Sequence, residues 1–100
     1  MIGSIPSVAQ LKPLEFVEYD MPNGLHVILH EDHSAPVVAT VVHYKVGSRD
    51  EDPRRTGFAH FFEHLMFEGS KNVPGSSFDE WLTEAGGGNN AYTTPDETTY

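Results

Sequence analysis

Apolar and polar residues alternate along the first part of the chain in a way that predicts short β-strands. Residues 15–20 and residues 25–30 both alternate enough for a strand, and residues 21–24 between them end in Asn-Gly, which favours a tight turn. We therefore expect a β-hairpin. Residues 37–46 are rich in β-branched side chains and predict a well-buried strand.

A run of large apolar residues at 58–67 predicts the first helix, after a polar loop at 47–57. Thr56 is the expected N-cap, and Gly69 is the expected C′ residue that ends this helix. A helix that is apolar nearly all round is normally buried. Its large side chains, together with the single tryptophan, are the expected core residues: Phe58, Phe61, Phe62, Leu65 and Trp81.

A second helix is predicted to begin with a capping box, formed by Ser77 as the N-cap and Glu80 three residues later. The glycines at 86–88 should end it, and residues 89–100 then have a strand-like Tyr and Thr content that Pro95 interrupts. Short, antiparallel-looking strands that alternate with two helices predict an α+β fold, an antiparallel sheet with helices packed on one face.

The domain organisation follows from the two ends of the chain. Residues 1–14 are marked by Pro and Ser and are expected to form a flexible N-terminal arm. Residues 15–100 then form the N-terminal part of one domain, which we expect to be truncated because the chain stops within a strand-like pattern.

Composition narrows the possible partners. The 15 acidic residues outnumber the 6 Lys and Arg residues and give a formal charge of −9, which argues against nucleic acid or an anionic membrane as the main partner. No segment approaches the roughly 18 apolar residues of a membrane span. The absence of cysteine excludes disulfides and thiolate ligands, so a zinc site here would need His and carboxylate ligands.

The candidate chemistry lies within the first predicted helix, in the sequence His60-Phe61-Phe62-Glu63-His64. Two imidazoles four residues apart fall on one face of a helix, so their nitrogens can converge on one Zn²⁺ at about 2.0–2.1 Å. Glu63 lies on the same face as His60 and can reach a water bound to that metal. Two neutral ligands, a base and a metal-activated water are the parts of a zinc hydrolase, in the H-x-x-E-H order of the inverzincins.

The same motif has a second reading, in which both His side chains are hydrogen-bonded within the core and the Glu points to solvent. The apolar surroundings favour the metal, because burying two imidazoles and a carboxylate costs several kcal/mol unless partners satisfy them. The remaining His residues are expected to have no metal role: His26 and His30 would be about 13 Å apart on a strand, His33 lies in a turn, and His43 should make a local hydrogen bond. The acidic run 50–52 is expected to be solvated rather than to bind calcium.

Four ordered motifs resemble those of the pitrilysin/insulinase family of zinc metallopeptidases. They are N-G-L-x-V at 23–27, V-G-S-R-x-E at 46–51, T-G-x-A-H-F-x-E-H-x-x-F-x-G at 56–69, and N-A-Y-T…D-x-T-x-Y at 90–100. This family includes insulin-degrading enzymes, the β subunit of the mitochondrial processing peptidase and many bacterial zinc peptidases. The resemblance implies a two-layer domain in which the H-x-x-E-H helix lies over the sheet, here incomplete.

The resemblance implies roles for individual residues. His60 and His64 would be zinc ligands, and Glu63 would be the general base that deprotonates the metal-bound water. Asn90 and Ala91 match the strand that, in the family, pairs with the extended substrate backbone by β-augmentation. Asn90 could equally be a turn residue after the glycine run, since Asn favours such turns.

The sequence departs from the family in what it lacks. A third zinc ligand, a Glu, comes in the family from a helix well downstream, and this chain ends before it, which leaves the site short of the three protein ligands usual in catalytic zinc. Glu68 is not expected to substitute, because the helix should end at Gly69. Family enzymes also enclose peptide substrates between two homologous halves, so a second half or subunit is the expected partner.

We therefore expect the full-length protein to be a zinc endopeptidase acting on peptides or small unfolded proteins, and the 100-residue piece alone to be inactive. The alternative is a non-catalytic structural or substrate-presenting subunit of the same family, against which the intact motif argues. The relatives suggest a bacterial cytoplasm or periplasm. The opening residues show no secretory signal.

Overall fold

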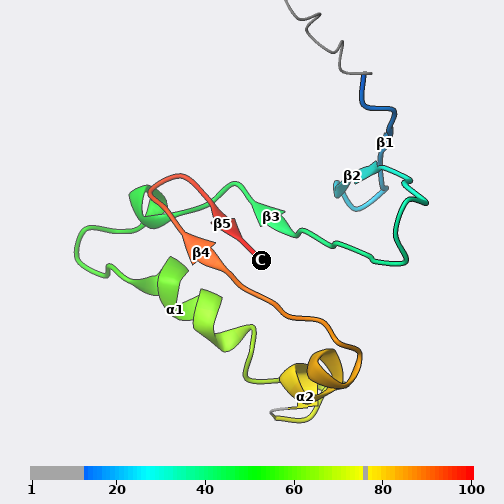
Figure 1. The fold of residues 1–100 in the computed structure, drawn as a ribbon. Helices are drawn as coiled ribbons and strands as arrows, with labels where there is room; N and C mark the ends of the chain where they lie inside the picture. Colours follow the sequence, from blue (N-terminus) through cyan, green and yellow to red (C-terminus); the bar gives the residue numbers. More distant parts are fainter. Residues whose placement is uncertain (1–12, 76) are drawn as a thin grey trace, which may run out of the picture. The chain divides into compact units, whose positions relative to one another are not determined.

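A computed structural model describes residues 13–75 and 77–100 (Figure 1). The chain divides into two compact units, Met1–Val38 and Ala39–Tyr100. Most of the predicted arm at 1–14 lies outside the described residues, and its flexibility stays a prediction. No helix in the described part of the chain is long and apolar enough to cross a membrane.

The first unit contains the predicted hairpin. Its strands are β1 (Val17–Asp20) and β2 (His26–Leu29), which pair antiparallel with Asp20 opposite His26. The backbone N–H of Gly24 donates to the carbonyl of Met21 at 2.9 Å, and Gly24 has a φ of +87°, which only glycine adopts without strain. The Asn-Gly signal therefore predicted the turn correctly.

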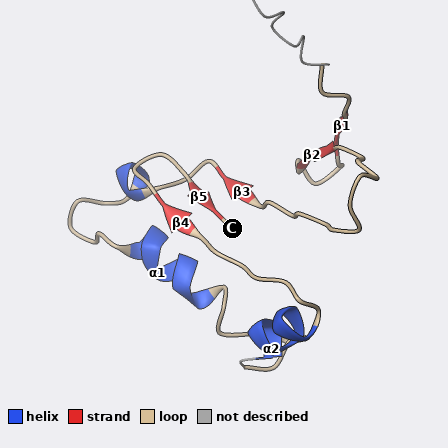
Figure 2. Ribbon diagram, in the orientation of Figure 1, coloured by secondary structure: helices blue, strands red, loops and turns tan. Residues whose placement is uncertain are grey.

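The second unit is built on a three-stranded antiparallel sheet. Its strands are β3 (His43–Tyr44), β4 (Tyr92–Thr93) and β5 (Thr98–Thr99), in the spatial order β3-β5-β4 (Figure 2). Two further hydrogen bonds between Val42 and Tyr100, of 3.0 and 2.9 Å, extend the pairing of β3 with β5. β4 lies at the edge of this sheet within the described part of the chain.

The register of the sheet sorts its side chains into two rows. Thr98 lies opposite both Tyr44 and Thr93, so these three side chains share one face. Tyr44 and Thr98 from this row line a cavity together with residues of helix α1 (Phe58–Leu65), so the row faces the helix. The sheet with α1 on one face confirms the expected α+β arrangement.

The second helix, α2 (Ser77–Glu84), lies where a helix was predicted, between Ser77 and the glycines at 86–88. Ser77 is already inside the helix, so its assignment as the N-cap was wrong; the preceding residue lies outside the described part. At the other end, the N–H of Gly87 donates to Leu82 O at 2.8 Å and that of Gly86 to Thr83 O at 3.0 Å. Gly86 has a φ of +73°, so this is a Schellman motif, and the predicted helix end is confirmed.

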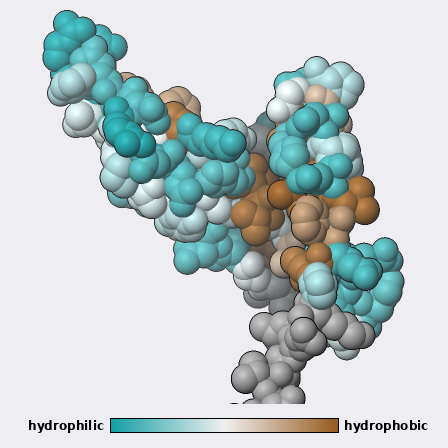
Figure 3. All heavy atoms as spheres, turned by 90° about the horizontal axis from the view of Figure 1, so that it is seen from above, coloured by the Kyte–Doolittle hydropathy of each residue, from teal (hydrophilic) through white to brown (hydrophobic). Residues whose placement is uncertain are grey.

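Burial differs from the sequence-based expectation. No hydrophobic side chain in residues 13–75 and 77–100 is buried, and Figure 3 shows hydrophobic residues at the surface. The expected buried strand at 37–46 was wrong, because Val38 is 93% exposed and pairing is confined to Val42 and to the two residues of β3. Three two-residue strands and one helix cannot enclose a core. The expected core residues are therefore all exposed, between 39% and 57%: Phe58, Phe61, Phe62, Leu65 and Trp81.

Gly47 is buried, and it lies against the turn between β4 and β5. A Cβ at this position would overlap Thr94 O, and the next two backbone N–H groups bind that turn: Ser48 N to Thr94 O at 3.1 Å and Arg49 N to Pro95 O at 2.9 Å. The glycine of the V-G-S-R motif therefore allows the loop after β3 to dock on the end of the sheet, just before the segment that leads into α1.

Candidate metal centre

Helix α1 brings His60 and His64 together one turn apart. Their Nε2 atoms are 2.9 Å from each other, and both side chains are exposed. Two nitrogens bound to one tetrahedral zinc at about 2.05 Å would be about 3.3 Å apart. The two Nε2 atoms therefore converge, and a small change in the side-chain torsions would allow both to bind one zinc ion.

The described residues supply no third ligand. Within residues 13–75 and 77–100, no group of three or more His, Asp or Glu side chains is placed to hold a metal ion. Helix α1 ends at Leu65, and the chain leaves it through two tight turns in which Phe67 N donates to His64 O and Glu68 N to Leu65 O. Gly69, with a φ of +107°, follows these turns and is not the C′ residue, because the C-cap is already Met66.

Glu63 is half-buried between α1 and the sheet. Its Oε2 accepts a hydrogen bond from the Oγ1 hydroxyl of Thr93 on β4. The pKa of Tyr100 is raised, first by burial and then by electrostatic repulsion from Glu63 and Tyr44. Sequence reasoning gave Thr93 no role, although the N-A-Y-T motif contains it.

The start of α1 is fixed by Glu51 from the preceding loop. The N–H of Gly57 donates to Glu51 Oε2 at 2.6 Å, and that of Ala59 donates to Oε1 at 2.7 Å. The helix N-cap is Gly57, with a φ of +93°, so the assignment of Thr56 was wrong. A carboxylate at this end satisfies free backbone donors and complements the helix dipole.

Asp50 and Asp52 of the acidic run are exposed, as expected, but the run also has structural partners. Asp50 Oδ2 accepts a 3.0 Å hydrogen bond from Gly47 N, and Asp52 pairs with the Arg54 guanidinium at 2.7 Å. This ion pair lowers the pKa of Asp52 and raises that of Arg54. The run holds the loop that leads into α1.

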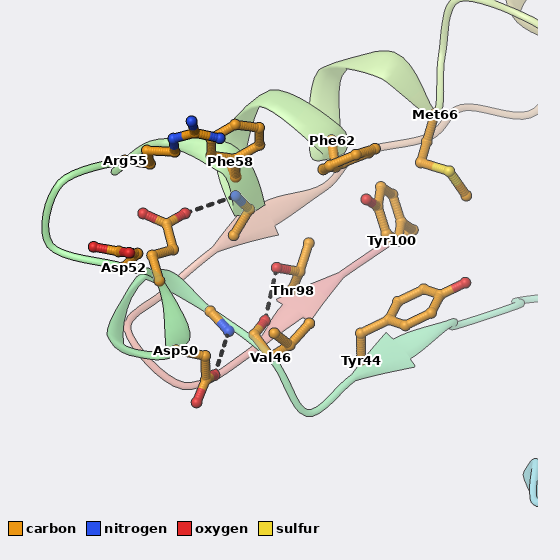
Figure 4. Close-up of a pocket in the computed structure, with 13 residues that line it drawn as sticks. Tyr44, Val46, Asp50, Asp52, Arg55, Phe58, Phe62, Met66, Thr98 and Tyr100 are labelled. Carbon is orange, nitrogen blue, oxygen red and sulfur yellow. Dashed lines mark hydrogen bonds between the residues drawn. The ribbon is translucent and has the colours of Figure 1, made fainter.

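An apolar cavity of about 600 Å³ lies between α1 and the sheet (Figure 4). The histidine pair and Glu63 do not line it, so it belongs to the packing of the helix on the sheet and not to the metal centre. Thr98 at its floor donates through Oγ1 to Val46 O at 3.0 Å. Its apolar and aromatic walls come from Tyr44, Phe58, Phe62, Met66 and Tyr100.

Asn90 and Ala91 lie immediately before β4 and not within it. Asn90 Oδ1 accepts a 2.9 Å hydrogen bond from Ala91 N, and Ala91 is partly buried. Their role in substrate binding stays a prediction.

The other histidines make contacts elsewhere. His43 Nδ1 lies 3.0 Å from Thr99 Oγ1, which confirms the expected hydrogen bond. His26 Nδ1 lies 2.8 Å from Asp20 Oδ1, a bond that raises the pKa of His26. His30 Nδ1 lies 2.6 Å from Glu15 O.

Residues 26–100 match the family described as insulinase, peptidase family M16. The zinc protease PqqE of Helicobacter pylori is 40% identical over 81 residues, which cover 80% of this chain and 18% of that protein. The mitochondrial cytochrome b-c1 complex subunit 1 of Homo sapiens is 40% identical over 80 residues, which cover 80% of this chain and 16% of that protein. The chain therefore spans less than one fifth of either relative.

Solved structures show the same local fold. Pitrilysin superposes with a TM-score of 0.79 at 29% identity, over 95% of this chain and 11% of that one. The first half of the periplasmic protease PqqL from Escherichia coli superposes with a TM-score of 0.69 at 32% identity, over 89% of this chain and 20% of that one. The chain thus has the fold of part of a pitrilysin-like domain.

Proposed function

Because the chain belongs to the insulinase family of peptidases, peptidase family M16, we propose that it is the zinc-binding part of a zinc-dependent endopeptidase for peptides or small unfolded proteins. The observation that supports this most directly is the convergence of two Nε2 atoms to 2.9 Å with Glu63 on the same helix. A relative named as a zinc protease shares this part of the chain at 40% identity.

Three residues of helix α1 would have distinct roles in catalysis. His60 and His64 would hold the zinc, which when bound polarises a peptide carbonyl and lowers the pKa of its water to about 7. Glu63 would act as general base: Oε2 accepts a hydrogen bond from Thr93, which favours Oε1 as the oxygen that accepts the proton of the attacking water. The same carboxyl could then pass that proton to the leaving amine.

The edge of the sheet is the proposed substrate site. β4 has β5 on one side and no strand partner on the other within the described residues. An extended peptide could add to that open edge through main-chain hydrogen bonds, next to Asn90 and Ala91. Recognition of this kind depends on the main chain of the peptide more than on its side chains, so a broad range of peptides could bind.

The whole protein is proposed to supply what this chain does not. The third zinc ligand would be a carboxylate from a later segment, since catalytic zinc usually has three protein ligands. A homologous second half or subunit would close over the substrate. The 100-residue chain by itself is then expected to lack activity.

The test is Glu63→Gln in the full-length protein that contains this chain. Turnover should fall by about 10² to 10⁴, the usual contribution of a general base, while zinc stays bound at one ion per chain. His60→Ala should lose both zinc and turnover. Glu68→Gln, a matched change just beyond the same helix, should keep both. Turnover unchanged by Glu63→Gln would contradict the proposal.

A second candidate is a non-catalytic subunit, favoured by the 40% identity to a cytochrome b-c1 complex subunit. It predicts no chelator-sensitive peptide hydrolysis by the wild-type full-length protein, whatever its zinc content. The intact zinc motif argues for the enzyme.

A further inference from the structure

We propose that Thr93 is a positioning residue for Glu63, and that it joins the edge strand β4 to the proposed general base. The inference rests on the proposed function and deepens it. It starts from one contact: the Thr93 hydroxyl donates to Glu63 Oε2, between two residues that are thirty positions apart in sequence.

The backbone directs this contact. Thr93 lies opposite Thr98, and Thr98 lines the cavity under α1, so Thr93 also points to the helix side of the sheet. Its neighbour Tyr92 points to the other side and donates its hydroxyl to Glu97 at 3.1 Å. Thr93 is therefore the residue of β4 that can reach the helix.

The helix presents Glu63 to β4 for an equally local reason. Phe58, Phe62 and Met66 repeat every four residues and line the cavity, which fixes the rotation of α1 over the sheet. With that rotation fixed, Glu63 lies beside β4. The contact thus depends on the packing of α1 and on the register of β4 together.

The chemical consequence is a choice between two carboxylate oxygens. A Glu side chain has three rotatable bonds, so an unanchored carboxylate would sample many orientations. A hydroxyl bound to Oε2 restricts that freedom and occupies one acceptor site of Oε2, which favours Oε1 as the acceptor. Thr suits this task because its branched Cβ restricts the rotamer that aims the hydroxyl.

The same bond links substrate binding to the base. A peptide that pairs with the open edge of β4 would order the strand that carries Thr93. The hydroxyl would then be fixed when substrate is bound, which is when the base is needed. Thr93 itself would touch neither substrate nor metal.

The experiment compares three threonine variants in the full-length protein. Thr93→Val keeps the shape and removes the hydroxyl; it should lower kcat about 10- to 100-fold, as changes to residues that orient a metal site commonly do, with KM within about threefold and one zinc per chain retained. Thr93→Ser restores a hydroxyl and should return kcat to within about threefold of wild type. Thr99→Val, on the neighbouring strand with its hydroxyl 3.0 Å from His43, is the matched control and should be unchanged.

A thermal-unfolding cycle tests the contact without any activity. Thr93→Val should lower Tm clearly in the wild-type background and much less in a Glu63→Ala background, because the acceptor is then already gone. Equal shifts in both backgrounds, or a kcat that Thr93→Ser fails to restore, would overturn the inference. Failure of the proposed function can be told apart from failure of this inference. If only the proposed function fails, the unfolding cycle still shows coupling between Thr93 and Glu63, but neither wild type nor any variant hydrolyses peptides.

Discussion

Asp20 and His26 face each other across the β1–β2 hairpin and give a titration that can be measured. The 2.8 Å hydrogen bond to Asp20 is the largest cause that raises the pKa of His26, and Glu18 at 3.5 Å from Nε2 adds less. Asp20→Asn should lower that pKa, followed by NMR of the imidazole protons. Glu18→Gln is the control and should lower it less; an equal or larger fall would contradict the assignment.

The direction of the pH effect on stability follows from the same shift. A histidine whose pKa is raised by folding adds stability that is fully present below its unfolded-state value of about 6.5. That contribution is lost as the pH rises through the folded-state pKa. The hairpin should therefore lose this stabilisation above pH 6.5, and the Asp20→Asn protein should show a weaker dependence of unfolding on pH in that window.

At the scale of the element, helix α1 is only eight residues long and depends on its ends. Glu51 binds the N–H groups of Gly57 and Ala59 at the N-terminus. Glu51→Ala should destabilise the protein by about 1–2 kcal/mol, the cost of losing a helix cap, as measured by urea unfolding. Glu51→Gln keeps an acceptor but loses the charge, so its effect should be smaller.

The helix end also bears on the metal centre. His60 lies in the first turn of α1 and His64 in the second, so fraying of the first turn would move His60 relative to His64. Glu51→Ala should therefore also weaken zinc binding. Glu68→Ala, beyond the other end of α1, removes an acid where the helix dipole does not favour one, and should cause little loss of either stability or zinc affinity.

At the scale of the whole molecule, the apolar side chains of the second unit are exposed around α1 and the sheet. Phe61 is 56% exposed, Phe62 57% and Met66 56%. We expect the 100-residue chain alone to bind a hydrophobic dye such as ANS, to hold zinc weakly through two imidazoles, and to show no chelator-sensitive peptide hydrolysis. Peptide hydrolysis by the purified 100-residue chain that a chelator abolishes would show this prediction to be wrong.

Local patterns predicted the elements and the candidate ligands. The Asn-Gly pair at 23–24 predicted the turn of the β1–β2 hairpin, and the glycine run at 86–88 predicted the end of α2. The convergence of His60 and His64 follows from a spacing of four on any helix. These features depend on neighbours within a few residues, so sequence alone determined them.

Burial, capping and the partner of Glu63 were decided by tertiary structure. Residues 37–46 have the composition of a buried strand, but a strand is buried only where partners and a second layer cover it, and Val38 has neither. Thr56 is a good N-cap residue by type. The backbone N–H groups at the start of α1 bind the carboxylate of Glu51 instead, because the loop folds back on α1. Thr93 reaches Glu63 only when the register of β4 and the rotation of α1 are both fixed. Contacts between distant residues depend on how elements pack, and no local pattern encodes that packing by itself.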